Sequence, residues 1–263
     1  MRALSWYLVV AALVAGTAAR AEEVFVRDSD KQIKSTVEKI RKDQSKFRGA
    51  LAGDFKNSVV RSADGEFKVK DFLKDFDTAT ERVEQRFGGK YSASNEVQQL
   101  LQLGAKMHVV VRGNPAMKGA NEWDVLAGEL NALAKSYGAK FPPETDAPIR
   151  RIGDAELEDA LVAVTKATDG VKSELKKAQK SSPELVQRTT GTSADLDALK
   201  KASSTLKSRI ASGEPATAEA RQVFAIEESI RVALEGAPPA VATAWAHVTT
   251  PLSKVVQAFG FGS

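Results

Sequence analysis

One helical pattern occurs twice in this sequence, and that repetition constrains the fold more than any other feature. The pattern that starts at Trp123 recurs from Trp245 at a constant offset of 122 residues. Steps of three and four residues place its apolar positions on one face of a helix. The matched positions are Trp123, Leu126, Leu130, Leu133, Ala134, Tyr137 and Gly138 in the first copy, and Trp245, Val248, Leu252, Val255, Val256, Phe259 and Gly260 in the second.

The last two matched positions predict how both helices end and what they bury. In each copy a glycine follows the last aromatic residue, where a helix commonly ends in a left-handed residue. Aromatic side chains at the ends of an apolar stripe are usually core residues. Trp123, Trp245, Tyr137 and Phe259 are therefore predicted anchors of two equivalent cores.

The repetition extends upstream through three more amphipathic segments. Residues 76–87 and 99–115 match residues 199–210 and 222–238 at an offset of 123, and residues 33–51 match 157–175 at an offset of 124. The predicted helices are 29–58, 69–88, 93–112 and 119–138 in the first copy, and 154–179, 194–211, 216–235 and 240–259 in the second. No convincing strand pattern accompanies them. Pro251 falls inside the last helix and predicts a kink or a late helix start there.

The fold class follows from these segments. Short connections favour antiparallel neighbours, and each helix has one apolar stripe to bury. We therefore expect an all-α chain made of two tandem up-down four-helix bundles related by internal duplication. Residues 22–140 form the first bundle and residues 154–263 the second. Residues 141–153 form a linker, since three prolines between 141 and 148 cannot continue a helix.

The first 21 residues have the pattern of a secretory signal peptide. Arg2 precedes an unbroken apolar run at residues 6–15, and Ala19-Arg20-Ala21 provides the small residues that signal peptidase requires. A retained anchor is the alternative, but ten residues of helix span only ~15 Å of a ~30 Å hydrocarbon core. We expect a periplasmic or secreted protein with no transmembrane segment after cleavage.

Charge and cysteine content exclude several kinds of protein. The signal peptide removes Arg2 and Arg20, which leaves 36 basic against 34 acidic residues. Such a balance gives no reason to expect a nucleic-acid partner. The chain contains no cysteine, which excludes disulfides, cysteine-ligated zinc, thioether-bound haem and a lipid-anchored amino terminus.

Without cysteine, histidine is the main residue type that could bind a metal or haem, and the sequence contains two histidines. His108 and His247 both lack the glutamate three residues earlier that di-iron bundles require, because Ala105 and Ala244 occupy those positions. Each is expected to be a surface or boundary imidazole, with a ligand role as the alternative. We expect no cofactor. Catalytic motifs of hydrolases and metalloproteases are missing too, so an enzyme is not expected.

Two polar residues interrupt otherwise apolar stripes at matched positions. Gln44 lies in the stripe of the first helix, and Thr168 takes the same place in its counterpart. A polar side chain there must find a hydrogen bond or reach water. These positions mark either a small internal polar site or register device, or a helix edge that faces solvent.

Two further segments carry a family resemblance. Residues 107–113, which begin Met-His-Val-Val, and residues 121–134, which begin Asn-Glu-Trp-Asp-Val-Leu-Ala, resemble the third and fourth helices of exported bundles of the cytochrome c-prime type. That family attaches haem through a Cys-x-x-Cys-His segment late in the last helix. Here the corresponding helices end at Tyr137-Gly138 and Phe259-Gly260 without such a motif. The resemblance thus implies a duplicated relative that lacks the haem, and it carries over no functional residue.

Two functions agree with these features. The first is a non-enzymatic exported protein with a binding or structural role, whose partner is an envelope protein or a small ligand. Duplication would give it two similar surfaces. The second is a bundle that binds a noncovalent haem, a metal or a small ligand through His108 or His247.

The mature protein is expected to begin at Glu22, because the small residues at 19 and 21 satisfy signal peptidase. After expression in a bacterium and recovery from the periplasm, its intact mass should equal that of residues 22–263 alone, with no visible absorbance. A mass that includes residues 1–21 would contradict cleavage. A Soret band would contradict the expected absence of haem.

Overall fold

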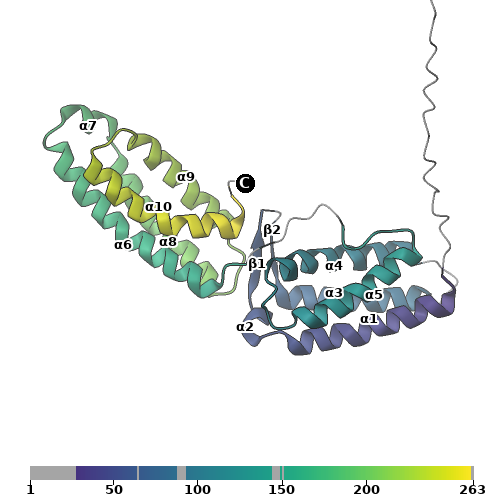
Figure 1. Ribbon diagram of the computed structural model, residues 1–263. Helices are drawn as coiled ribbons and strands as arrows, with labels where there is room; N and C mark the ends of the chain where they lie inside the picture. Colours follow the sequence, from purple (N-terminus) through teal and green to yellow (C-terminus); the bar gives the residue numbers. More distant parts are fainter. Residues whose placement is uncertain (1–27, 64, 88–92, 144–148, 150, 262–263) are drawn as a thin grey trace, which may run out of the picture.

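A computed structural model describes residues 28–63, 65–87, 93–143, 149 and 151–261. The expected signal peptide lies outside these residues, as do residues 144–148 and 150 of the expected linker. The described chain is mostly helical, which confirms that part of the prediction. Figure 1 shows two groups of helices, with a β-hairpin where they meet.

The first unit comprises residues 28–143, whose four long helices surround one apolar core. α1 packs against α3 and α5, and α4 packs against the same two helices. Its elements are α1 (Asp30–Ala50), α2 (Gly53–Lys56), β1 (Val59–Ser62), β2 (Gly65–Lys68), α3 (Val69–Phe87), α4 (Ser94–Gly113) and α5 (Ala120–Ser136).

The second unit comprises residues 151–261 and repeats this packing around a separate core. α6 packs against α8 and α10, and α9 packs against the same two helices. Its elements are α6 (Asp154–Gln179), α7 (Pro183–Arg188), α8 (Thr192–Ala211), α9 (Thr217–Ala233) and α10 (Pro239–Phe259).

The first helix starts where the sequence predicts and ends earlier. The Ser29 side chain accepts from the Gln32 backbone N–H while the Gln32 side chain accepts from that of Ser29, a reciprocal cap. The helix stops at Ala50, and Leu51 adopts an extended conformation. The predicted span of 29–58 is therefore too long, because the apolar stripe ends at Leu51 and the next buried residue, Phe55, lies on α2.

Two further details concern the predicted helices of the second unit. The loop predicted between the first two helices of the second unit contains α7, which Ser182 caps by accepting from the Leu185 N–H. Of the two alternatives at Pro251, a kink or a late start, the late start is wrong, since α10 begins at Pro239 and continues through Pro251. Proline cannot donate to the carbonyl of His247, so one backbone hydrogen bond is missing in that turn.

The β-hairpin is the main element that the sequence pattern did not predict. β1 pairs antiparallel with β2 in a register that sets Val60 opposite Phe67 and Arg61 opposite Glu66. Val59 and Val60 are both buried, and Arg61 is buried beside them. Four-residue strands carry too little alternation to be recognised from a single sequence.

Arg61 of the hairpin is buried between the two units, with 3% of its side chain exposed. Its Nε lies 3.2 Å from Oε1 of Glu66, close enough for an ion pair although not aligned as a hydrogen bond. Its Nη1 donates to Oδ1 of Asp154 in the first turn of α6. The guanidinium also lies 5.7 Å from the centre of the Phe259 ring at the end of α10. One side chain thus joins the hairpin to two helices of the other unit.

Glu66 is the second contact between the units and completes a helix start. The backbone of α9 has no side-chain cap of its own. Instead, Oε2 of Glu66 accepts from the N–H groups of Ala216 and Thr217, both at 2.7 Å, and from the Thr217 hydroxyl at 2.6 Å. A carboxylate is favourable there because it faces the positive end of the helix dipole.

The hairpin tip also touches the end of α10. Gly260 has a φ of 65°, and a Cβ at that position would lie 2.5 Å from the backbone nitrogen of Ala63. Any other residue would be strained and would push the two units apart.

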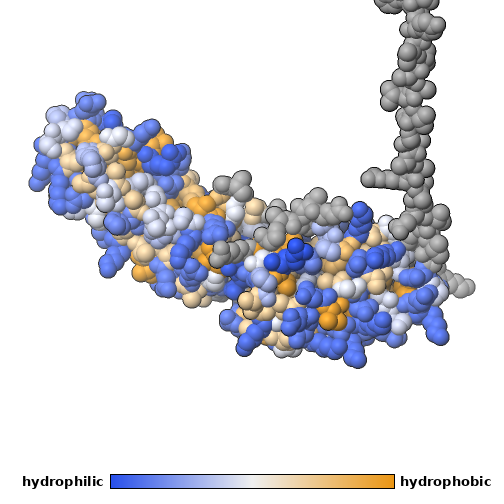
Figure 2. All heavy atoms as spheres, in the orientation of Figure 1, coloured by the Kyte–Doolittle hydropathy of each residue, from blue (hydrophilic) through white to orange (hydrophobic). Residues whose placement is uncertain are grey.

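Charged and polar side chains cover most of the visible surface, which Figure 2 shows in blue. Within the described ranges, none of the helices combines the length and the apolar character needed to cross a membrane.

Arg61→Ala is expected to lower the free energy of unfolding by about 3–5 kcal/mol, because it leaves the carboxylate of Glu66 buried without its cation. Urea unfolding followed by circular dichroism measures this change. Lys200→Ala is the matched control, since its ion pair with Asp169 is exposed and is worth less than about 1 kcal/mol. Equal effects of both variants would contradict a special role for Arg61.

Candidate functional site

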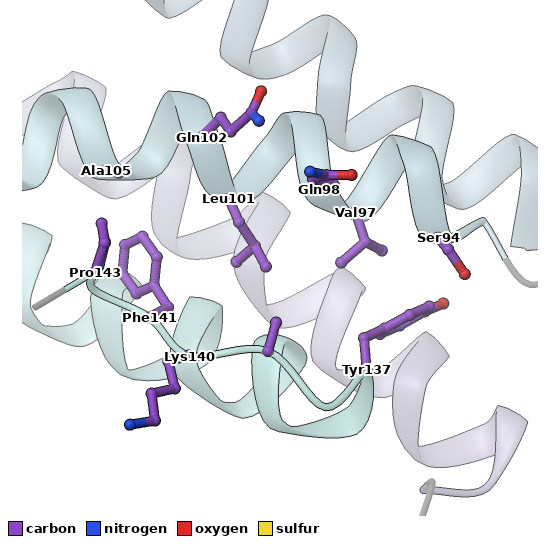
Figure 3. Close-up of a pocket in the computed structure, with 11 residues that line it drawn as sticks. Ser94, Val97, Gln98, Leu101, Gln102, Ala105, Tyr137, Lys140, Phe141 and Pro143 are labelled. Carbon is purple, nitrogen blue, oxygen red and sulfur yellow. The ribbon is translucent and has the colours of Figure 1, made fainter.

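A groove of about 430 Å³ runs along α4 of the first unit. Its other wall is the chain that leaves α5, residues 137–143. Figure 3 shows Val97 and Leu101 pointing from α4 towards this chain, with Tyr137 at one end and Phe141 at the other. The volume is within the usual range for small-molecule sites.

The groove is lined mainly by apolar side chains, with neutral polar groups among them. Gln98, Gln102 and Ser94 supply amides and a hydroxyl, and Lys140 is the one charged residue of the lining. Figure 3 shows Lys140 pointing away from α4. The apolar lining residues are Val97, Leu101, Ala105, Tyr137, Ala139, Phe141 and Pro143.

The end of α5 sets the position of the second wall. Gly138 and Ala139 donate to the carbonyls of Lys135 and Ala134, the pattern that closes a helix and turns the chain. The chain then runs back beside α4, where Phe141 is buried. Gly104 makes this approach possible, because a Cβ there would lie 3.0 Å from the Phe141 ring.

The second unit has an aromatic ring where the first has the groove. Phe261 N–H donates to Val256 O, as Ala139 N–H does to Ala134 O, at the offset of 122 that the sequence pattern gives. The Phe261 ring packs on Phe224 and Phe259, with centroid distances of 5.2 and 5.8 Å. Leu101 and Tyr137, two groove residues, occupy the corresponding positions in the first unit. The groove therefore lies where the second unit holds Phe261.

His108 lies beside the groove, and its half-buried ring is hydrogen-bonded to a core residue. Its Nδ1 accepts a hydrogen bond of 3.2 Å from Nε1 of the buried Trp123, which fixes the proton of the neutral ring on Nε2. Nε2 is itself buried and has no hydrogen-bond partner. The Phe141 ring meets the imidazole edge-on at 5.8 Å. Neither ring nitrogen is presented to a metal or haem in this arrangement.

The other histidine lies elsewhere. His247 is exposed on α10, in the second unit, so the structure does not bring the two histidines together. In the part of the chain that the structure describes, no group of three or more histidine and acidic residues is placed to hold a metal ion.

Gln44 and Thr168 are both buried, so the solvent-facing alternative is wrong for them. Oε1 of Gln44 accepts from the hydroxyl of Thr80 on α3 at 3.1 Å, while its Nε2 has no partner. In the second unit Thr168 donates to the carbonyl of Val164, and the hydroxyl of the buried Ser203 has no partner. Ser203 matches Thr80 at an offset of 123, so each unit buries one polar residue on each of its first two long helices at matched positions.

The predicted core anchors divide into two kinds. Trp123, Trp245 and Phe259 are buried in the two cores. Tyr137 is half-buried and lines the groove instead. The sequence pattern did not predict the groove, because the matched positions stop at Gly138 and Gly260. The next matched position holds alanine in the first copy, Ala139, and phenylalanine in the second, Phe261. This difference is the signal that could have indicated the groove.

His108 is expected to make the stability of the fold depend on pH. Burial, and then the positive charge of Arg112, lower the pKa of His108 below its ordinary value of 6.5, with Asp124 opposing them. As the pH falls below 6.5, the unfolded chain takes up a proton before the folded protein does, so acid destabilises the fold.

His108→Gln is expected to reduce this loss of stability between pH 7 and pH 5, because glutamine keeps an acceptor for Trp123 and does not titrate. Urea unfolding at several pH values measures it, and His247→Gln at an exposed site is the control. Unchanged pH dependence in His108→Gln would contradict the assignment.

Comparison of the chain with protein-family models, with curated proteins and with solved structures found no match. None of these comparisons therefore bears on the resemblance to cytochrome c-prime-type bundles. The side chains of the groove are the basis on which a function can be proposed.

Proposed function

We propose that this is an exported, non-enzymatic binding protein that consists of two duplicated four-helix bundles and holds a small apolar molecule in the groove of the first. The single observation that carries the proposal is the groove between α4 and residues 137–143. Export rests on the signal-peptide pattern of residues 1–21.

Duplication is supported by backbone hydrogen bonds that recur at the offsets found in the sequence. The bonds match at helix starts and at helix ends. The matched pairs are Ile33 to Ser29 with Leu157 to Gly153, Val97 to Ala93 with Ala220 to Ala216, Asn114 to Val111 with Ala237 to Leu234, and Gly138 to Lys135 with Gly260 to Gln257. The buried polar residues Gln44 and Thr80, matched by Thr168 and Ser203, support it as well.

The lining favours holding a ligand over transforming it. The residues that line the groove contribute no carboxylate, imidazole or thiol. Lys140, the one titratable amine, points away from α4. The lining residues supply no carboxylate or imidazole that would activate the hydroxyls of Ser94 and Tyr137 for proton transfer or nucleophilic attack. What remains is dispersion with Val97, Leu101 and Phe141 and hydrogen bonding to neutral groups such as the amide of Gln98.

The second bundle supports this proposal because its site that matches the groove is filled by a side chain of the protein. Phe261 is partly buried against the second core and takes up the corresponding space. A shared fold therefore holds a side chain in one unit and leaves room in the other. We infer that the first unit is the binding unit and that the second has a structural role.

Ala139→Phe is expected to fill the groove with the protein's own ring, because phenylalanine occupies the matched position of the second unit. Titration of the neutral dye Nile red into the protein should give saturable fluorescence with the natural sequence. Binding at least about tenfold weaker is expected for the variant, since burying a ring-sized apolar group is worth ~1.5–3 kcal/mol.

Ala132→Phe is the matched control, since it adds the same ring to an exposed position of α5 outside the groove. It should bind Nile red like the natural protein. Dye binding that survives Ala139→Phe, or that is lost equally in both variants, would rule out the groove as the site.

A further inference from the structure

We propose that the ligand of the groove is a small molecule with one aromatic ring and a neutral hydrogen-bonding group, and that Phe261 is the internal copy of that ring. This inference rests on the proposed function and narrows it to a chemical class. It starts from the one ring that the protein itself places in the matched site of the second unit.

The two sites are equivalent at the level of the backbone. Gly138 and Gly260 have φ values of 66° and 65°, and the residue after each glycine donates to a carbonyl five residues earlier. Ala139 and Phe261 therefore leave their helices in the same direction. What differs is the side chain, a methyl group in the first unit and a benzyl group in the second.

The contacts of Phe261 show what such a site offers to a ring. Phe259 stacks on it with an interplanar angle of 17°, and Phe224 meets it edge-on with an angle of 80°. In the first unit the corresponding residues are Tyr137, which has an aromatic face, and Leu101, which has an apolar side chain. Both line the groove. Stacking of aromatic rings adds to the gain from burial, so an aromatic group is favoured there.

The polar part of the ligand follows from a second difference between the sites. Arg221 places its guanidinium 5.9 Å from the centre of the Phe261 ring. Gln98 takes that position in the first unit, with Gln102 one turn further along α4. An amide side chain donates and accepts hydrogen bonds without charge. A neutral amide or hydroxyl therefore fits beside the ring better than a carboxylate or an ammonium group.

The groove is also longer than the site that Phe261 fills. It continues past Leu101 to Ala105, Phe141 and Pro143. A ligand whose ring lies on Tyr137 can thus extend its remaining atoms along α4 towards Phe141. This length favours a substituted aromatic molecule over a bare ring such as benzene, which would fill only one end of the groove.

The test uses 3-phenylpropanamide, with propanamide as the control probe that lacks the ring. Titration into the ¹⁵N-labelled protein should shift the amide signals of Gln98 and Leu101 saturably. Propanamide should bind at least about tenfold more weakly, because it loses the burial of the ring. Ala139→Phe should abolish the shifts in the first unit, whereas Ala132→Phe should keep them.

Phe261→Ala provides the converse variant, since it should open the matched site of the second unit. In that variant 3-phenylpropanamide should shift the amide signals of Arg221 and Phe224 as well, at a second equivalent of ligand. If Phe261→Ala does not fold, the test rests on Ala139→Phe and Ala132→Phe. Loss of 3-phenylpropanamide binding in the first and its retention in the second supports the proposal, and retention in both overturns it.

The proposed function and the aromatic ligand class can fail separately. Saturable Nile red binding without binding of 3-phenylpropanamide would overturn the aromatic class and leave a site for other apolar molecules. Equal binding of 3-phenylpropanamide and propanamide would overturn it too. Failure of both Nile red and 3-phenylpropanamide to bind would overturn the site itself.

Discussion

The ion pair between Arg61 and Glu66 is the interaction on which the arrangement of the two units depends. The hairpin register sets these residues opposite each other, and both side chains are almost fully buried. Two charges removed from water are costly unless each finds further partners. Arg61 finds Asp154 and the face of Phe259, while Glu66 finds the free N–H groups at the start of α9. The hairpin of one unit therefore stabilises the helix ends of the other, and the further partners of both charges are present only where the units meet.

The two units share one packing pattern and differ in the chain that follows the last helix. In each unit the first long helix packs against the second and the fourth, and each of the first two buries one polar residue at a matched position. At the end of the last helix the units differ, since the chain of the first continues along α4 and that of the second places Phe261 on its core. Ala139 lines the groove of the first unit, and the matched residue of the second unit is Phe261, whose ring packs on Phe224 and Phe259.

Helices and their faces were predictable because their signals are local. Ser29 and Gln32 form a cap within four residues, and the 154–179 helix was placed at the bounds that α6 has. The hairpin was not predictable, since its buried charges depend on partners 93 residues away or further. Gln44 was identified as an interruption of the apolar stripe, but its partner Thr80 lies on another helix and became visible only through packing. The groove was missed for a similar reason, because its walls come from α4 and from a segment more than thirty residues later.

By itself, the sequence determined the helical nature of the chain, the recurrence of its apolar stripes at offsets of 122 to 124, and the positions of Trp123, Trp245 and Phe259 as core residues. These follow from the period of the side chains along a helix, which neighbouring residues set. Tertiary structure alone decided that the hairpin joins the units, that His108 is held by Trp123, and that a groove is left beside Tyr137 and Leu101. These features depend on which distant surfaces meet and how much space their side chains leave, and the spacing of residues along one helix does not contain that information.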